Sequence, residues 1–150
     1  MTPEQMYTRL KGLNLSDKFA KYLTAQIVAE TGVKLNSNLL VNHNNPGGIM
    51  FINKGYQKNA VQGPPFPASE TKGKPVFYAT FKTLDDGLRD MVRITYPSLV
   101  KSNTPEAYAE NLKAQGYFAG NLETYKKNVR FAFDNLEKGL KKKLKKEAEK

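Results

Sequence analysis

One carboxylate of this chain stands where a helix would turn it towards the protein interior. The residues at helical spacing that form this stripe are Phe19, Leu23, Gln26, Ile27 and Glu30. Charged side chains are almost never fully buried unless they are paired or functional. Burial disfavours the anion and raises the pKa of a carboxyl group, which suits a general acid. The alternative is that Glu30 lies at a frayed helix end and turns to water, and the stripe alone does not decide between the two.

Capping residues mark the start and the end of the helix that would carry Glu30, and those of the helix before it. Ser16 is expected to cap the Glu30 helix, and Gly32 is expected to adopt the left-handed conformation that stops it. Upstream, Thr2 is followed by a proline and then by Gln5, which is the capping pattern of a helix start, and Gly12 marks the end of that first helix. The sequence therefore predicts two helices within residues 2–32.

The middle of the chain predicts a small β lobe. A polar link with a short helix around residues 35–41 leads into a turn at residues 43–48 (His-Asn-Asn-Pro-Gly-Gly). The apolar run 49–52 and the strand-forming run 76–81 are expected to pair as an antiparallel sheet. Residues 53–75 between them are rich in proline and glycine, and we expect them to form a loop that covers the sheet as a flap.

Three further helices are predicted after this lobe. Thr83 has the capping spacing that opens a helix to about Val100, and Thr104, followed by a proline, opens a helix to about Gln115. The last helix begins near Leu122, and its apolar stripe continues into the lysine-rich end of the chain. The predicted fold class is therefore α+β, mostly α, with a small β lobe beside a helical lobe.

Length and composition indicate a folded chain with an excess of positive charge. The chain has 150 residues, of which 39% are hydrophobic, and a formal net charge of +10. Residues 138–150 contribute +5 of that charge through seven lysines and two glutamates. This balance favours a polyanionic surface or substrate such as nucleic acid, anionic lipid or an acidic cell-wall polymer. The absence of cysteine excludes disulfides and thiolate catalysis, and the single histidine, His43, excludes a multi-histidine metal site.

Five short blocks follow one another along the chain, at residues 25–32, 45–50, 69–73, 81–92 and 112–119 with Tyr125. Together they resemble the bacterial glucosaminidase family, peptidoglycan hydrolases with a lysozyme-like fold. Residues 25–32 (Ala-Gln-Ile-Val-Ala-Glu-Thr-Gly) look like the catalytic-helix motif of that family, and residues 45–50 (Asn-Pro-Gly-Gly-Ile-Met) are similar to its asparagine-to-glycine-isoleucine turn. Residues 69–73 (Ser-Glu-Thr-Lys-Gly) look like the hairpin that carries its second acidic residue, and residues 81–92 resemble its Phe-Arg block with the following helix. Residues 112–119 (Leu-Lys-Ala-Gln-Gly-Tyr-Phe-Ala), together with Tyr125, are similar to its late glycine-tyrosine motif.

The resemblance implies an endo-β-N-acetylglucosaminidase that cleaves β-1,4 bonds of the peptidoglycan glycan without a metal or cofactor. Glu30 would be the general acid, and Glu70 in the flap would be the second carboxylate, unless the acetamido group of the substrate takes that part. Tyr117 would bind the sugar or the transition state through its hydroxyl. Asn45 and the backbone around Gly48 would bind an acetamido group of the substrate.

Other functions remain open at this point. A muramidase or a lytic transglycosylase on the same scaffold is the nearest alternative, and a transglycosylase can work with a single catalytic glutamate. A non-catalytic virion component that retains a lysozyme-like fold is another. Nucleic acid is not expected as a partner, because the lysine-rich end has no aromatic residue on which bases would stack. The expected partners are peptidoglycan glycan strands, with virion proteins as a further class, and no membrane span is expected.

The expected domain organisation is simple. We expect one lysozyme-like glucosaminidase domain over residues 1–137, followed by a lysine-rich helix extension or tail over residues 138–150. Residues 1–10 lack a basic region followed by an apolar run, so no secretory signal is expected. The protein would then act at the bacterial cell wall after delivery by a phage virion, by a holin or by another route that needs no signal peptide.

Overall fold

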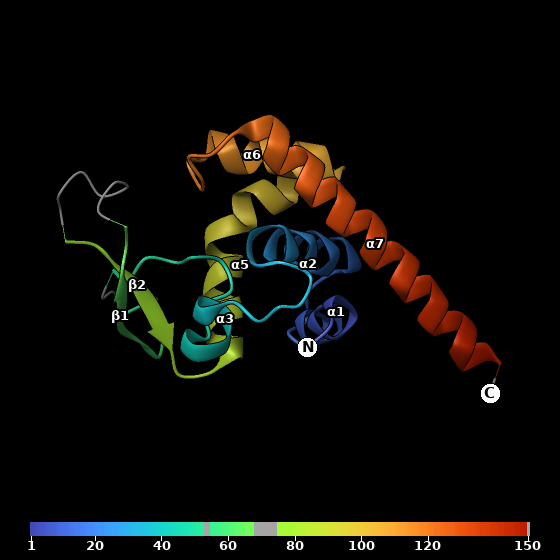
Figure 1. The fold of residues 1–150 in the computed structure, drawn as a ribbon, viewed down its shortest axis with the longest axis horizontal. Helices are drawn as coiled ribbons and strands as arrows, with labels where there is room; N and C mark the ends of the chain where they lie inside the picture. Colours follow the sequence, from blue (N-terminus) through green and yellow to red (C-terminus); the bar gives the residue numbers. More distant parts are fainter. Residues whose placement is uncertain (53–54, 68–74, 150) are drawn as a thin grey trace. The chain divides into compact units, whose positions relative to one another are not determined.

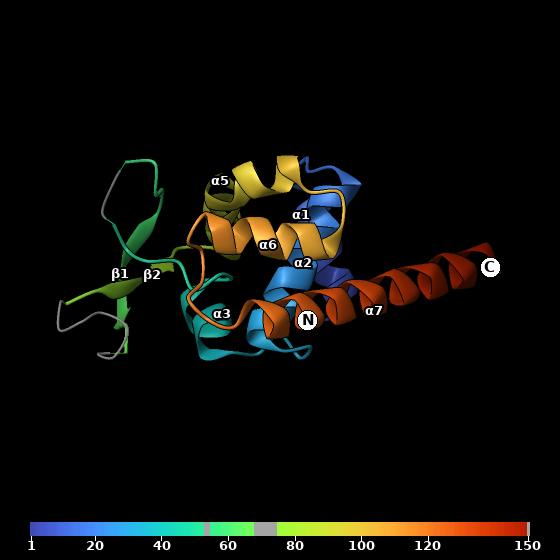
Figure 2. The same cartoon turned by 90° about the horizontal axis from the view of Figure 1, so that it is seen from above.

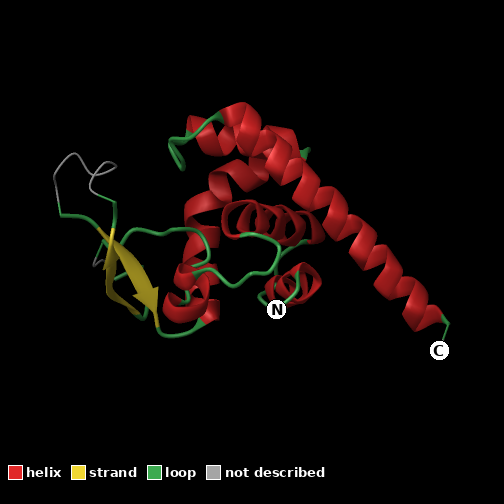
Figure 3. Ribbon diagram, viewed as in Figure 1, coloured by secondary structure: helices red, strands yellow, loops and turns green. Residues whose placement is uncertain are grey.

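The structure of the protein, a computed structural model, describes residues 1–52, 55–67 and 75–149 (Figure 1). The chain forms two compact units, Met1–Leu35 with Thr95–Lys150 and Asn36–Ile94. We call the first the helical unit and the second the sheet unit. Helices dominate the described residues, and their sheet has two antiparallel strands (Figure 3). The predicted fold class, α+β and mostly α, is confirmed.

The helical unit is built from capped helices whose starts agree with the sequence-based predictions. Thr2 and Gln5 form a capping box, Ser16 Oγ accepts a hydrogen bond from the Phe19 N–H at 3.1 Å, and Thr104 caps in the same way. The elements of this unit are α1 (Pro3–Lys11), α2 (Asp17–Thr31), the second part of α5 (Leu84–Lys101), α6 (Pro105–Ala114) and α7 (Leu122–Ala148).

Helix α2 ends at Gly32, as predicted, although the backbone conformation there differs from the expected one. Gly32 has a positive φ of 93°, which favours glycine, but its ψ of 159° is extended rather than left-handed helical. Its N–H donates to the Val28 carbonyl at 2.7 Å and closes the last turn. Glu30 therefore occupies the final turn of α2, immediately before the chain leaves the helix.

The face of α2 that the stripe predicted to be buried does lie in a core. Helix α2 packs on α1 and on α7, which lies beside it in Figures 1 and 2. Ala25 meets Val129 and Ala132 of α7 in an apolar cluster, and Tyr125 packs against the same cluster. This packing brings the first turn of α7 to the last turn of α2. Three residues of the predicted stripe have no accessible surface: Leu23, Gln26 and Ile27.

The sheet unit adds a strand to the predicted pairing. Strand β1 (Ala60–Pro65) pairs antiparallel with β2 (Phe77–Phe81), with Ala60 opposite Phe81. Residues 49–51 also pair antiparallel with β2, as predicted, through the Met50–Tyr78 bridge and two backbone hydrogen bonds of 2.8 Å, from the Phe51 N–H to the Phe77 carbonyl and from the Ala79 N–H to the Ile49 carbonyl, but this pairing is too short to count as a strand. The unit also contains α3 (Asn38–His43), which agrees with the predicted short helix, and the first part of α5.

The sequence did not predict strand β1, because its second half, Gly-Pro-Pro, consists of residues that disfavour strands. Such residues are tolerated on an edge strand, and both strands of a two-stranded sheet are edges. A Cβ atom on Gly63 would lie 2.5 Å from Thr80 Oγ1 and 2.9 Å from the Tyr78 carbonyl oxygen. The glycine therefore permits a close approach of β1 to β2 that a larger residue would prevent.

Helix α7 continues through the lysine-rich segment to Ala148 without a break, and Figure 2 shows it running past α1 and α2 to the C-terminus. The predicted boundary at residue 137 falls inside this helix, so the described part of the segment is a helix extension. Within the described residues, no helix has both the length and the apolar character needed to cross a membrane.

Candidate active site around Glu30

Glu30 lies where the end of one helix meets the start of another. Its side chain is accessible to solvent, and its Oε1 accepts a hydrogen bond from Tyr125 Oη at 2.8 Å. Tyr125 lies in the first turn of α7, which Asn121 caps by accepting a hydrogen bond from the Thr124 N–H at 3.0 Å. The capped helix start therefore presents a phenol donor to the carboxylate at the other helix's end.

The surroundings of Glu30 favour its protonated form. Its pKa is raised from 4.5 to about 7, chiefly because the surrounding protein removes water from the carboxylate, while the hydrogen bond from Tyr125 and the amide of Gln26 act in the opposite direction. Protein atoms crowd the carboxyl group even though the residue retains accessible surface. Among the described residues, no other carboxylate contributes to the shift. Glu30 is therefore a carboxyl group that retains its proton to a much higher pH than an ordinary glutamate and still has accessible surface.

A chain of buried polar groups lies behind Glu30. Tyr108 Oη donates a hydrogen bond to Gln26 Oε1, Thr95 bonds to the Tyr108 hydroxyl, and all three residues are fully buried. Gln26 lies four residues before Glu30 and so on the same face of α2. Its Nε2 forms no regular hydrogen bond with a described residue. Because Tyr108 holds the oxygen of the amide, the Gln26 Nε2 is a buried donor available on the side of Glu30.

The loop between α6 and α7 places two aromatic residues beside Tyr125. The ring of Phe118 stacks on Tyr125 with centroids 3.9 Å apart and planes 18° apart. Lys113 Nζ lies 5.2 Å from the centroid of Phe118 and donates to the Gly120 carbonyl at 2.8 Å, which holds the loop to α6. The pKa of Tyr125 is raised mainly by burial, then by Glu30, with a smaller contribution from Tyr117. Tyr117 precedes Phe118 in this loop, and its role in sugar binding stays a prediction.

Asn45 has a different role from the one the sequence suggested. The residue is fully buried, and its Nδ2 donates to the carbonyl oxygens of Ile49 and Ala79, each at 2.8 Å. Its Oδ1 accepts from the Ile49 N–H at 2.8 Å. Every polar group of the amide is thus engaged with the backbone of the sheet unit. The assignment of Asn45 to acetamido binding is corrected, because no donor or acceptor of its side chain is left for a ligand.

Two further predicted residues belong to the middle of the chain. Gly48 is exposed in the turn after Asn45 and has a φ of +63°, so its role in binding stays a prediction. Glu70 and the hairpin predicted at residues 69–73 lie outside the described residues. Of the predicted site residues, Glu30 and Tyr117 belong to the helical unit.

Sequence reasoning missed the two tyrosines that organise this site. In the sequence, Tyr125 stands out only through its likeness to the late glycine-tyrosine motif, and no pattern marks Tyr108. Each contacts a residue of α2 more than eighty positions away, Tyr125 touching Glu30 and Tyr108 touching Gln26. The available signal was the recurrence of tyrosine on two helices whose apolar faces also had to pack on α2.

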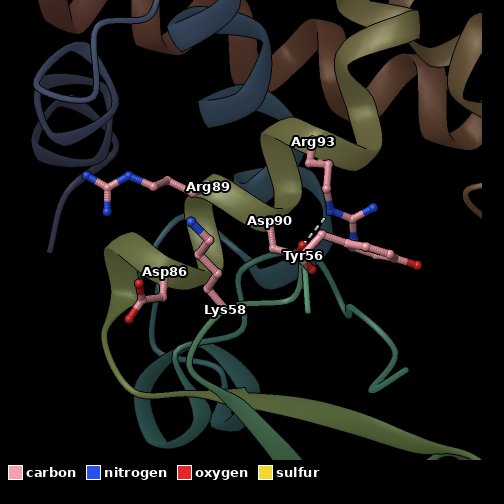
Figure 4. Close-up of a pocket in the computed structure, with 6 residues that line it drawn as sticks. All are labelled: Tyr56, Lys58, Asp86, Arg89, Asp90 and Arg93. Atoms are coloured by element: carbon pink, nitrogen blue, oxygen red, sulfur yellow. Dashed lines mark hydrogen bonds and ion pairs between the residues drawn. The ribbon is translucent and has the colours of Figure 1, made fainter. Parts of the chain in front are cut away.

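The sheet unit contains a small polar cavity of about 90 Å³ (Figure 4). Arg93 Nε lies 2.7 Å from Asp90 Oδ1, and the Arg93 guanidinium stacks on the Tyr56 ring, 4.5 Å from its centroid. Figure 4 shows Arg89 extending away from Arg93 and Tyr56. Asp90 thus pairs with one of the three cations of this cavity, and we assign the cavity no ligand. Its lining residues are Tyr56, Lys58, Asp86, Arg89, Asp90 and Arg93.

Comparisons with known proteins identified no relative of this chain. Neither a scan against family profiles nor searches of curated proteins and of solved structures found a match.

The raised pKa of Glu30 predicts a specific pH dependence of stability. Because the folded-state pKa of about 7 exceeds the ordinary 4.5, the native state holds the proton more tightly, and the free energy of unfolding should fall as pH rises from 4.5 to 7. Glu30→Gln removes this loss. The free energy of unfolding of the variant should therefore equal that of the wild type near pH 4 and exceed it at pH 8. Solvent contact limits the gain to about 1 kcal/mol.

Urea unfolding at pH 4, 6 and 8 measures this difference between the two proteins. Glu149→Gln, at an exposed position at the end of α7, is the matched control and should follow the wild-type pH profile. A Glu30→Gln profile that runs parallel to the wild type over the whole range would refute the shift.

Proposed function

We propose that this chain hydrolyses the β-1,4 glycosidic bonds of bacterial peptidoglycan, as an endo-β-N-acetylglucosaminidase with Glu30 as the general acid. The observation that carries the proposal is the Glu30 carboxyl at the end of α2, with a pKa near 7 and a phenol donor on its Oε1. Glycoside hydrolysis needs such an acid, protonated at the working pH, beside the leaving oxygen. The ordered motifs that resemble the glucosaminidase family support the choice of substrate.

In the proposed reaction, the proton of Glu30 passes to the glycosidic oxygen as the bond from that oxygen to the anomeric carbon breaks. Glu30 becomes an anion in this step, and the hydrogen bond from Tyr125 stabilises the charge. The Nε2 of Gln26, held in place through Tyr108, is a second donor for the same anion. The residues around Glu30 therefore favour the proton before transfer and stabilise the carboxylate after it.

The partner of the general acid is a separate part of the proposal. A hydrolase needs a carboxylate that activates water or stabilises the oxocarbenium ion, or a substrate acetamido group that does so. Glu70 is our candidate carboxylate from the sequence. Tyr117, in the loop before α7, is our candidate from the sequence for binding the sugar through its hydroxyl.

A lytic transglycosylase is the second candidate, and the acid at Glu30 would be sufficient for it. The Glu30 carboxyl has a pKa of about 7, so it can give a proton and later accept one. In a transglycosylase the muramic 6-hydroxyl attacks its own anomeric carbon, so a single acid that later acts as base is sufficient. The product would then be a 1,6-anhydro ring instead of a reducing end.

Digestion of purified peptidoglycan sacculi distinguishes these activities. The released fragments are reduced with borohydride and analysed by mass spectrometry. We expect fragments that end in reduced N-acetylglucosamine. Ends of reduced muramic acid or of anhydro-muramic acid would replace the glucosaminidase assignment by a muramidase or a transglycosylase. Absence of any soluble fragment would refute enzymatic activity on this polymer.

Removing the phenol donor should change both the rate and the pH profile. Tyr125→Phe eliminates the hydrogen bond that stabilises the Glu30 anion, so we expect kcat on sacculi to fall by roughly 10-fold. The same bond lowers the pKa of Glu30, so its loss raises that pKa and moves the alkaline limb of the pH profile to higher pH. Steady-state rates from pH 5 to 9 measure both effects.

Tyr96→Phe is the matched control for this substitution. Tyr96 is 53% exposed on α5 and packs edge-on against Phe19, so loss of its hydroxyl should change neither the rate nor the alkaline limb. An unchanged alkaline limb in Tyr125→Phe would contradict the role of the hydrogen bond in setting the pKa of Glu30.

A further inference from the structure

The cations of the helical unit fall into two groups, one paired with carboxylates and one exposed on the α7 extension. Lys21, Lys126 and Arg130 each contact two carboxylates, at distances of 2.5–3.6 Å. The lysines of the α7 extension are all exposed, and none forms an ion pair within the described part of the chain. No carboxylate occurs between Lys138 and Lys146 in the sequence. Three cations of the body are thus paired with carboxylates, whereas the extension carries a series of lysines with no carboxylate among them.

Five of these lysines lie on one face of the helix, and we call them the lysine arc. Their positions follow the i, i+3, i+4, i+7, i+8 spacing of a single helical face and span about 12 Å along the axis at roughly 1.5 Å per residue. Leu136, Leu140 and Leu144 recur at four-residue intervals on the opposite face. The members of the arc are Lys138, Lys141, Lys142, Lys145 and Lys146.

The extension is held against the body of the unit on its other side. Leu136 is 1% exposed and Leu140 is half-buried. The backbone at Gly139 lies so close to the side chain of Glu4 that a Cβ there would be 1.9 Å from Glu4 Oε1. Packing of α7 on α1 therefore holds the extension around Leu136 and Gly139, while Leu144 is 66% exposed and the arc is directed to solvent.

Helix stability alone does not explain five lysines on this face. The helix dipole favours cations only within the last turn, which accounts for Lys145 and Lys146. The other three members lie beyond the reach of that effect. Like charges three and four residues apart destabilise a helix, and every member of the arc has such a neighbour. An external polyanion would remove this repulsion along the whole face.

We infer that the lysine arc binds a linear phosphodiester polymer of the bacterial cell wall, of the poly(glycerol phosphate) type. Charge complementarity with a repeating phosphate is what a row of exposed lysines provides. An anionic membrane fits less well, because an interfacial helix inserts a continuous apolar face, whereas here Leu136 is buried in the unit, Leu140 is half-buried and Leu144 alone is largely exposed. Nucleic acid fits less well, because the extension carries no aromatic residue for base stacking. The choice of a wall polymer rests on the proposed function.

Salt-dependent binding of the full chain to purified poly(glycerol phosphate) tests this inference. If the arc neutralises five phosphates, log Kd should change with log salt with a slope of about 3.5, which weakens binding roughly 50-fold between 50 and 150 mM salt. Replacing all five arc lysines with Gln should remove most of this slope and weaken binding at least 10-fold at 50 mM. Replacing them with Arg should retain both.

The matched control removes the same charge from exposed lysines elsewhere. It replaces five lysines with Gln and should bind the polymer within 2-fold of the wild type. The inference is overturned if this control loses as much affinity as the arc variant, or if duplex DNA or phosphatidylglycerol vesicles bind the wild type more tightly than the polymer at 150 mM salt. The control positions are Lys11, Lys34, Lys82, Lys101 and Lys127.

Sacculi stripped of the polymer separate this inference from the proposed function. The arc variant should digest stripped sacculi at the wild-type rate and polymer-bearing sacculi more slowly. A wild-type chain that digests stripped sacculi but does not bind the polymer would refute the inference alone. A chain that binds the polymer but releases no fragment from either substrate would refute the proposed function alone.

Discussion

Glu30→Gln is expected to lower the rate of fragment release from sacculi by roughly 10³-fold while the protein remains folded. General acid catalysis contributes about 10²–10⁴-fold, and the amide of glutamine has no acidic proton to give to the leaving oxygen. The substitution preserves the size of the side chain, and the amide oxygen of glutamine can still accept the hydrogen bond from the Tyr125 hydroxyl. Rates measured at pH 6, below the pKa of about 7, compare the variant with a fully active wild type.

A control for this substitution changes another glutamate of the same unit. Glu110 lies on α6, is exposed, and contacts Lys126 at 3.5 Å, so Glu110→Gln should keep the wild-type rate. If Glu30→Gln retained more than a tenth of wild-type activity, Glu30 would not be the general acid. The wild-type rate should also fall as pH rises through 7, because the acid must be protonated to act.

Asn45→Ala is expected to destabilise the protein by about 3–5 kcal/mol, which is a large share of the roughly 5–15 kcal/mol of a typical domain. The substitution leaves the Ile49 N–H and the Ala79 carbonyl without their side-chain partner in a buried place, and it adds a cavity. The turn at residues 45–49 and its attachment to β2 should be lost first. Thermal unfolding followed by circular dichroism measures the change.

Asn42→Ala is the comparison that separates burial from residue type. Asn42 is exposed on α3 and its amide bonds only to the Asn38 side chain at 2.7 Å, so its loss should cost less than about 0.5 kcal/mol. A protein with Asn45→Ala that melted at the wild-type temperature but bound sacculi weakly would return Asn45 to the ligand site.

The features that the sequence predicted correctly are those set by neighbouring residues. Helix starts at Thr2, Ser16 and Thr104 follow from the geometry of a cap, which needs only the next three residues. The buried face of α2 follows from helical periodicity in the same way. These local rules were sufficient to place Glu30 in the last turn of a buried helix.

The features that escaped prediction depend on contacts distant in sequence or on a local exception. The hydrogen bond between Tyr125 and Glu30 joins two helices whose packing no local pattern specifies. Strand β1 breaks the rules of strand composition, because an edge strand tolerates proline and a glycine there meets Thr80 closely. Asn45 was misassigned for a related reason, since a polar turn residue reads as available until its backbone partners are known.

The side-chain carboxyl of Glu30 gives the most direct test of the central claim, that the protein holds a proton on this residue near neutral pH. Carbon-13 NMR titration of the full chain, with the signal assigned by its absence in Glu30→Gln, measures that pKa in solution. We expect a midpoint of about 7, because burial raises the pKa of Glu30 by more than the hydrogen bond from Tyr125 lowers it. A midpoint near the ordinary 4.5 would contradict the claim and remove Glu30 as the acid.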